Sequence, residues 1–117
     1  MAIAEVLVVD DDYGHLEIFS ELLTRLGHSG TVAASAFLGL RLLESRRFDL
    51  VFADVVMPVM DGVEFARRAN KIRPDLPIVF VTGYPRQATE MLGNGTLTLL
   101  KPLSGRTLEN VIQERVR

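Results

Sequence analysis

Residues 50–54 read Leu-Val-Phe-Ala-Asp, four apolar residues that end at a carboxylate. Three other short runs also end at polar residues: 6–9 before Asp10-Asp11-Asp12, 78–81 before Thr82, and 97–100, apolar except at Thr98, before Lys101-Pro102. Short, continuously apolar runs are typical of strands that are buried on both faces, as in a parallel sheet covered by helices. Ligand sites of such sheets lie at the carboxyl ends of the strands. We therefore expect the carboxylates, the hydroxyl and the ammonium group to meet at one edge of the sheet.

Segments with helical patterns separate these runs and predict five helices. Asp12 is a typical cap for a helix that ends near Gly27, and Ser104 is a typical cap for the last helix. The other expected helices cover 35–46, a segment that begins at Asp61-Gly62 and stops before Pro74, and a short segment at 87–92 before a turn at Gly93-Asn94-Gly95. With a weaker strand at 31–34, strand and helix alternate five times along residues 1–117. This alternation predicts one α/β domain with a parallel sheet, because each parallel crossover needs a helix.

The composition excludes several classes of protein. The chain has 117 residues and a hydrophobic share of 48%, which fits one globular domain. Its 13 basic and 15 acidic residues give a formal charge of -2, so no surface for direct nucleic-acid binding is indicated. Without cysteine, the chain forms neither disulfides nor thiolate metal sites, and the run 6–9 is too short to anchor it in a membrane. We expect a cytoplasmic protein.

The acidic residues at two of the strand ends predict a metal site. Two carboxylates ~4 Å apart repel by ~4 kcal/mol at an effective dielectric constant of about 20, so Asp10, Asp11 and Asp54 need a cation. Mg²⁺ suits them, because it binds a few carboxylate oxygens and keeps water and substrate phosphate in its shell. One carboxylate could then attack phosphorus, while Lys101 pairs with one phosphoryl oxygen and the Thr82 hydroxyl donates to another. These residues predict a site for phosphoryl transfer.

From end to end, the chain resembles the receiver domains of two-component response regulators. The resemblance is carried by Val8-Val9-Asp10-Asp11-Asp12, by residues 54–62 (Asp-Val-Val-Met-Pro-Val-Met-Asp-Gly), by Thr82-Gly83 and by Lys101-Pro102. It implies a flavodoxin-like, doubly wound sheet of five parallel strands in the order 2-1-3-4-5. It also implies that Asp54 accepts a phosphoryl group from a phosphohistidine partner. Further implications are that Asp11, Asp54 and the Val56 carbonyl hold Mg²⁺, that Asp10 assists partly through water, and that the Lys101-Pro102 bond is cis.

The chain departs from most relatives at its switch residues. Relatives often carry an aromatic residue three positions before the lysine, where this chain has Thr98. Tyr84, which follows Thr82-Gly83, is the nearest aromatic substitute, and residues 80–84 are similar to a threonine-glycine-tyrosine motif of some single-domain regulators. The fourth helix is also expected to be short, and many relatives use this region to dimerise. We therefore expect a monomer or a weak dimer.

The first predicted helix offers a candidate docking face. Ile18 and Leu22 widen its apolar stripe beyond what one core face requires. This width reflects either broad contact with the sheet and the last helix or, by resemblance, a surface that binds a histidine kinase or a histidine phosphotransfer protein. The downstream effector is unknown from the sequence.

Four other polar residues are interpreted as structural. Asp12 and Asp61 suit helix caps. His15 and His28 have no cysteine or acidic partner at a recognisable spacing, so surface or packing roles are favoured over metal binding. We place none of the four in the predicted metal site.

The preferred function is a phosphoacceptor switch, not an enzyme with an external substrate. The same residues would serve the receiver module of a hybrid histidine kinase, whereas the complete Asp, Thr and Lys set disfavours a pseudo-receiver that acts without phosphorylation. A phosphatase of the dehalogenase class needs a second aspartate two positions after its nucleophile, where this chain has Val56. A flavin mononucleotide carrier would share the fold, but three acids follow the first strand and would repel its phosphate.

Overall fold

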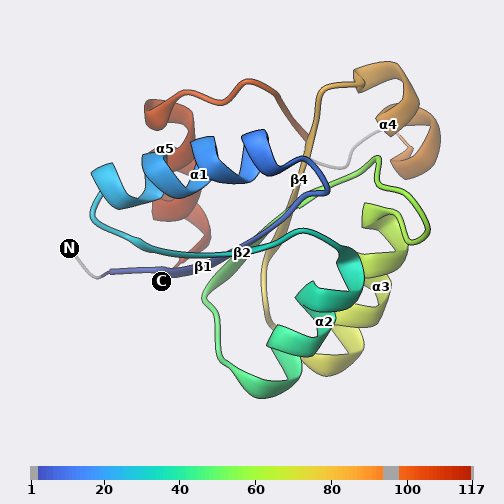
Figure 1. Cartoon of the computed structure of the whole chain (residues 1–117), viewed down its shortest axis with the longest axis horizontal. Coiled ribbons are helices and arrows are strands. Elements are labelled where there is room, and N and C mark those ends of the chain that lie inside the picture. Colours follow the sequence, from blue (N-terminus) through green and yellow to red (C-terminus); the bar gives the residue numbers. More distant parts are fainter. Residues whose placement is uncertain (1–2, 94–97, 117) are drawn as a thin grey trace.

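The computed structural model describes residues 3–93 and 98–116, in which five strands and five helices alternate (Figure 1). The strands are β1 (Glu5–Val9), β2 (Ser29–Ala33), β3 (Leu50–Asp54), β4 (Ile78–Thr82) and β5 (Thr98–Leu100). The helices are α1 (Tyr13–Arg25), α2 (Ala36–Ser45), α3 (Gly62–Ile72), α4 (Pro85–Leu92) and α5 (Gly105–Arg115). The alternation that the sequence predicts is confirmed.

The five strands form one parallel sheet in the order β2-β1-β3-β4-β5, which confirms the order implied by the resemblance. In this sheet Val9 pairs with Ala33 of β2 and with Ala53 of β3, and Asp54 pairs with Val81 of β4. The carboxyl ends of β1, β3 and β4 therefore lie side by side. This register brings the polar residues at these strand ends to one edge of the sheet.

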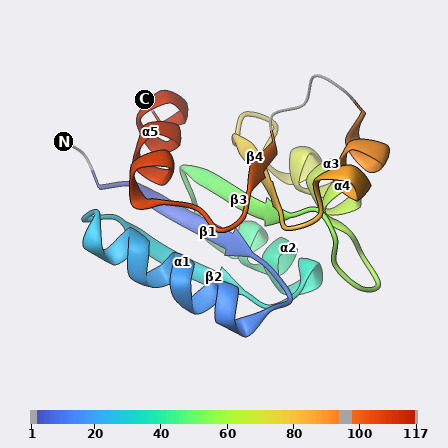
Figure 2. The same cartoon turned by 90° about the horizontal axis from the view of Figure 1, so that it is seen from above.

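Helices cover both faces of the sheet, which explains why its central strands are continuously apolar (Figure 1, Figure 2). Val6 and Val8 of β1 pack with α1 and α5 on one face, whereas Leu7 and Val9 pack with α2, α3 and α4 on the other. Because successive strand residues point to opposite faces, an apolar residue is needed at each position to fill both cores. Within the part of the chain that is described, none of these helices is long and apolar enough to cross a bilayer.

Side-chain caps begin four of the helices. Asp12, Ser35, Asp61 and Ser104 each accept a hydrogen bond from the backbone N–H three residues ahead, which satisfies a donor that the first turn leaves free. The predicted caps at Asp12, Asp61 and Ser104 are therefore confirmed. Gly27, with a φ of +86°, supplies the left-handed residue that follows α1.

Two elements begin earlier than the sequence predicts. β2 begins at Ser29 and not at residue 31, because its parallel pairing with β1 reaches back to Glu5. α4 begins at Pro85 and not at residue 87, since proline suits the first turn of a helix. With eight residues, α4 is the shortest of the described helices, as predicted. Residues 94–97, which include Asn94 and Gly95 of the predicted turn and the start of the last predicted strand, lie outside the described residues.

Val59 has a strained backbone in the loop after β3. Its φ of +68° lies in the left-handed region, which is costly for a β-branched residue, and the residue is 94% exposed. We expect Val59→Gly to raise the free energy of unfolding by about 1 kcal/mol, because the relief of strain exceeds the added entropy of the unfolded chain. Val59→Ala keeps the Cβ atom, so its free energy of unfolding should rise by less. Urea unfolding of both variants checks this, and a loss of stability in Val59→Gly would rule out the strain.

Candidate functional site

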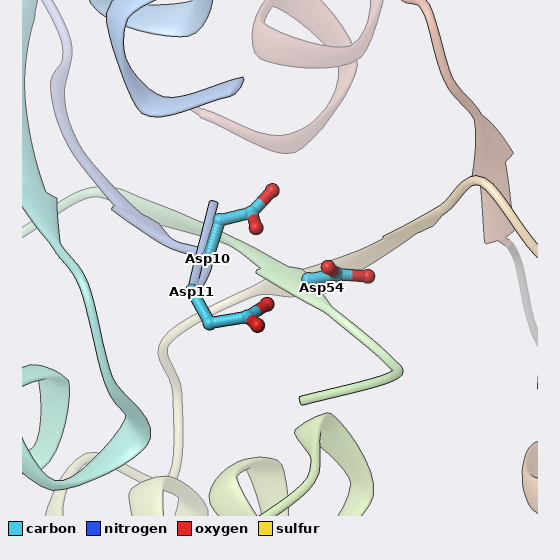
Figure 3. A group of neighbouring side chains, drawn as sticks. All are labelled: Asp10, Asp11 and Asp54. Carbon is cyan, nitrogen blue, oxygen red and sulfur yellow. The ribbon is translucent and has the colours of Figure 1, made fainter. Parts of the chain in front are cut away.

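The fold brings three aspartates together at the carboxyl ends of β1 and β3 (Figure 3). Asp10 and Asp11 follow β1, Asp54 ends β3, and one carboxylate oxygen from each lies within 4.8 Å of the other two. Asp10 and Asp54 are 1% and 7% exposed, whereas Asp11 lies at the surface. Asp12 is not part of this group, because its side chain caps α1. The group therefore combines two buried carboxylates with one that solvent reaches.

A glycine behind Asp54 fixes the end of β3. The Gly62 N–H donates to the Val55 carbonyl at 2.9 Å, so α3 begins directly against the strand end. A Cβ atom on Gly62 would overlap the Asp54 carbonyl oxygen and would lie 2.9 Å from the Val55 Cα. The Val55 N–H donates to the Val81 carbonyl of β4 at 3.1 Å. These contacts hold the Asp54 backbone between α3 and β4.

Lys101 brings a cation from the end of β5 to two of the aspartates. Its backbone N–H donates to the Thr82 carbonyl at 2.9 Å, and its peptide bond with Pro102 is cis, as the resemblance implied. Its Nζ lies 2.6 Å from Asp10 Oδ2 and 3.1 Å from Asp54 Oδ2. Among the residues that the structure describes, it is the only lysine or arginine that pairs with these aspartates. One such cation therefore faces three carboxylates.

Burial and like charge raise the pKa of Asp54. This pKa rises from 3.8 to about 6, first because burial disfavours the carboxylate and second because Asp10 is also negative, while Lys101 and, to a smaller extent, the Val56 backbone N–H oppose both effects. For Lys101, burial alone would lower the pKa, but the hydrogen bonds and charges of Asp10 and Asp54 outweigh burial and raise it. Lys101 therefore remains charged at neutral pH, yet it does not neutralise the site.

One oxygen of Asp54 has no partner. In the described part of the chain, Asp54 Oδ1 is the only buried side-chain nitrogen or oxygen without a hydrogen bond, whereas Oδ2 accepts from Lys101. A buried polar atom in this state costs on the order of 1–3 kcal/mol. A cation or a phosphoryl group at Oδ1 would remove this cost. The oxygens of Asp10, Asp11 and Asp54 are the hard ligands that Mg²⁺ prefers.

Thr82 lies buried at the end of β4, next to the end of β3. Its Oγ1 accepts from the Tyr84 N–H at 2.8 Å, so the hydroxyl retains its own proton as a donor. Tyr84 is exposed and precedes α4, while a Cβ atom on Gly83 would point into open space. Thr98 lies in β5, where it pairs with Phe80 of β4. Residues 82–84 thus form the turn that leads from the site into α4.

An open cleft of about 780 Å³ runs from the acidic group to part of α1. Its lining contains Asp11, Asp54 and Lys101, and also Ile18 and Leu22 of α1. Ile18 is 54% exposed. The two residues predicted to form a docking face therefore line the same cleft as the acidic group.

The contacts of the two histidines could not be predicted from the sequence, because their partners, Lys101 and Glu109, lie far away along the chain. His15 Nδ1 lies 2.9 Å from Lys101 Nζ, although its sequence context favours a surface or packing role. The one sequence feature that indicates the position of His15 is the cap at Asp12, which places His15 in the first turn of α1, close to the end of β1. His28 is buried, and its Nε2 lies 3.0 Å from Glu109 Oε1 of α5. Neither contact follows from local spacing.

We expect Asp54→Asn to stabilise the metal-free protein at neutral pH. The folded pKa of Asp54, about 6, exceeds the ordinary value of 3.8, so the folded state binds the proton more tightly than the unfolded state. The wild type therefore loses stability as the pH rises through this range, and asparagine avoids the loss. The gain should be about 1–2 kcal/mol, less than the full linkage value of about 3 kcal/mol, because Asp54 lines an open cleft whose solvent screens part of the repulsion.

Urea unfolding with a chelator present, at about pH 4 and about pH 7.5, measures this difference. The advantage of Asp54→Asn should be small at the acidic pH and should disappear at the neutral pH when excess Mg²⁺ is added. If the variant is no more stable than the wild type at neutral pH without metal, the charge balance described for the site is wrong.

Comparisons with known proteins agree with this fold. Residues 6–113 match the family profile of the response regulator receiver domain. The chain is 36% identical over 117 residues to the two-component response regulator ARR14 of Arabidopsis thaliana, in an alignment that covers 96% of this chain and 31% of that protein. The chain thus spans less than a third of the length of the curated relatives it matches.

Solved structures of receiver domains are similar along nearly the whole chain. A CheY-like receiver domain protein from Methanospirillum hungatei JF-1 is 30% identical, with a TM-score of 0.83 over 97% of this chain and 93% of that one. A second similar structure is the receiver domain of sensor histidine kinase PA1611 from Pseudomonas aeruginosa PAO1, which has a magnesium ion coordinated in the active site cleft. It is 26% identical, with a TM-score of 0.87 over 97% of this chain and 98% of that one. The chain therefore belongs to the receiver domains of two-component response regulators.

Proposed function

We propose that this receiver domain accepts a phosphoryl group on Asp54 and that the modification changes which partners it binds. The donor is a phosphohistidine of a histidine kinase or of a histidine phosphotransfer protein. The observation that carries the proposal is the state of Asp54, a buried carboxylate that pairs with Lys101 through Oδ2 while Oδ1 has no partner among the described residues. A carboxylate oxygen in this state is available as a nucleophile.

Mg²⁺ is the cofactor that these residues fit. Asp10, Asp11 and Asp54 would hold the ion together with the Val56 backbone carbonyl, with Asp10 acting partly through water. Support comes from the clustered carboxylate oxygens of this chain and from the magnesium ion in the similar PA1611 receiver domain. When bound, Mg²⁺ neutralises the acids and screens an incoming phosphoryl group from them.

Three side chains of the domain then carry out the transfer. Asp54 Oδ1 attacks phosphorus, an O–P bond forms, and the N–P bond of the phosphohistidine breaks with its electron pair going to the departing imidazole. Lys101 exchanges Asp54 Oδ2 for a phosphoryl oxygen, which its flexible side chain permits. Thr82 donates its hydroxyl proton to another phosphoryl oxygen. The product is an acyl phosphate on Asp54, which water later hydrolyses.

This chemistry makes the domain a switch, not an enzyme that turns over an external substrate, because it promotes only its own phosphorylation and dephosphorylation. The alternative setting for the same reaction is the receiver module of a hybrid sensor histidine kinase, and the similar PA1611 domain belongs to a sensor histidine kinase. A pseudo-receiver that acts without phosphorylation would have no need of Asp54, Thr82 and Lys101 together.

The response to phosphorylation would pass through Thr82 and Tyr84. Because Thr82 Oγ1 accepts from the Tyr84 N–H, a shift of Thr82 toward a phosphoryl group would move the start of α4. Gly83, between them, carries no side chain that would resist such a shift. Tyr84, which is exposed before the movement, would take the place of the aromatic residue for which this chain has Thr98.

The phosphohistidine donor would dock on the α1 side of the cleft. Ile18 and Leu22 line the cleft that also contains Asp54, and Ile18 is more than half exposed. An amphipathic helix laid against these side chains would bring its phosphohistidine to Asp54. We expect this interaction to involve a monomer or a weak dimer of the receiver domain, without direct contact with nucleic acid or membrane.

Intact mass measurement with a small-molecule phosphodonor tests the proposal. The wild type incubated with acetyl phosphate should gain one phosphoryl group only when Mg²⁺ is present, and Asp54→Asn should gain none. Asp49→Asn is the control, because Asp49 is an exposed acid that precedes β3 at its opposite end, and it should be labelled like the wild type. Equal labelling of Asp54→Asn would disprove the assignment of Asp54. No labelling of the wild type would instead favour a pseudo-receiver or a strict requirement for its own kinase.

A further inference from the structure

We infer that His15 is a positioning residue for Lys101: its neutral imidazole accepts a hydrogen bond from the ammonium group and keeps that group at the site when it releases Asp54. The inference rests on the proposed function, in which Lys101 moves from Asp54 to a phosphoryl oxygen. His15 lies in the first turn of α1 and lines the same cleft as Lys101 and Asp54.

The hydrogen bonds of Lys101 Nζ give His15 this role. An ammonium group carries three N–H donors and no acceptor. Three acceptors surround Nζ, namely Asp10 Oδ2 at 2.6 Å, His15 Nδ1 at 2.9 Å and Asp54 Oδ2 at 3.1 Å. Each donor therefore has one partner, and His15 provides the only uncharged one. Without the imidazole, one N–H of Lys101 would turn to solvent.

The contact also specifies which nitrogen of His15 carries the proton. Lys101 has no lone pair to offer, so Nδ1 must accept and the ring proton must be on Nε2. Both ring nitrogens lie near a carboxylate, Nδ1 at 3.4 Å from Asp10 Oδ2 and Nε2 at 4.0 Å from Asp12 Oδ2, so the assignment rests on the Lys101 ammonium group, which contacts Nδ1 and the same Asp10 oxygen. A neutral acceptor holds the ammonium group without adding another negative charge to the acidic site. A carboxylate at this position would bind Lys101 more strongly and would compete with the phosphoryl group for it.

During phosphoryl transfer, this arrangement leaves two of the three contacts of Lys101 in place. The lysine gives up Asp54 Oδ2, while Asp10 and His15 retain their hydrogen bonds. Asp10 also faces the proposed metal, so His15 is the one retained contact that the metal does not share. Each retained contact reduces the rotamer freedom that the long lysine side chain must lose to reach the phosphoryl oxygen. We therefore expect His15 to increase the rate at which Asp54 is phosphorylated.

Two substitutions of His15 separate this role from simple packing. His15→Asn keeps an acceptor near the position of Nδ1, whereas His15→Leu fills similar space without one. With acetyl phosphate and saturating Mg²⁺, the initial rate of phosphorylation should fall about tenfold in His15→Leu and less than about threefold in His15→Asn. Glu17→Leu is the control, since Glu17 is exposed on α1 and lines a separate hollow, and it should keep the wild-type rate. An equal loss in both His15 variants, or no loss in His15→Leu, would overturn the inference.

Nitrogen NMR gives a readout that does not depend on phosphorylation. In the metal-free wild type at neutral pH, His15 should carry its proton on Nε2 and none on Nδ1. His15→Leu should shift the Lys101 Nζ resonance, and Glu17→Leu should not. A proton on Nδ1, or a Lys101 resonance that is unchanged in His15→Leu, would show that the contact does not exist in solution. If acetyl phosphate fails to label the wild type, the result counts against the proposed function, but the NMR result still decides the His15 contact.

Discussion

Lys101→Met should slow the phosphorylation of Asp54 about a hundredfold and, at the same time, strengthen Mg²⁺ binding to the unphosphorylated protein. The rate falls because a charged donor to a phosphoryl oxygen is lost. Mg²⁺ binds more tightly because Lys101 Nζ, 2.6 Å from Asp10 and 3.1 Å from Asp54, competes with the metal for the same carboxylates. A lysine that served only to stabilise the fold would not change these two quantities in opposite directions.

Intact mass measured over time gives the phosphorylation rate, and calorimetric titration gives the Mg²⁺ affinity. Lys71→Met is the matched control, because Lys71 is an exposed lysine in the last turn of α3. It should leave both the rate and the affinity at their wild-type values. A rate for Lys101→Met within about threefold of the wild type, or weaker Mg²⁺ binding, would refute the role given to this lysine.

Gly62→Ala should destabilise the protein by about 3 kcal/mol, because the added Cβ atom has no room. The Cβ atom would overlap the Asp54 carbonyl oxygen and would lie 2.9 Å from the Val55 Cα. Both are backbone atoms, so the overlap is relieved only if the end of β3 or the start of α3 shifts. Since Asp54 belongs to the segment that shifts, its phosphorylation should also slow.

Gly105→Ala is the matched control for Gly62→Ala. Its Cβ atom would meet only Leu22 Cδ2 at 3.9 Å, which is an ordinary contact, and alanine suits the first turn of α5 better than glycine. Urea unfolding should therefore show a large loss of stability for Gly62→Ala and none for Gly105→Ala. A Gly62→Ala protein as stable as the wild type would mean that this close approach does not hold the end of β3.

The order of strands and helices could be predicted because most elements carry their own signal in the sequence. The runs 6–9 and 50–53 are apolar at every position, since helices cover both faces of the sheet. Asp12 and Asp61 mark helix starts through the hydrogen bonds that their side chains accept. The start of β2 could not be predicted in this way. Residues 29–30 become strand because β1 pairs with them, and not because of an apolar pattern of their own.

The grouping of Asp10, Asp11 and Asp54 could also be predicted, because the ends of parallel strands converge at one edge. The sequence could not show that Lys101 pairs with only two of these carboxylates, or that one oxygen of Asp54 lacks a partner in the described structure. It also gave no direct sign of the contact between His15 and Lys101. These details depend on side-chain rotamers and on packing between elements far apart in the chain, which no local pattern specifies.

The position of the phosphoryl group is the most direct test of the proposed function. Borohydride reduces an aspartyl phosphate to homoserine, so reduction after treatment with acetyl phosphate and Mg²⁺ marks the modified residue for peptide mass spectrometry. We expect homoserine at position 54 of the wild type and nowhere in Asp54→Asn. Homoserine at positions 10–12 instead, or a phosphate that survives reduction on a serine, threonine or histidine, would contradict a phosphoacceptor role for Asp54.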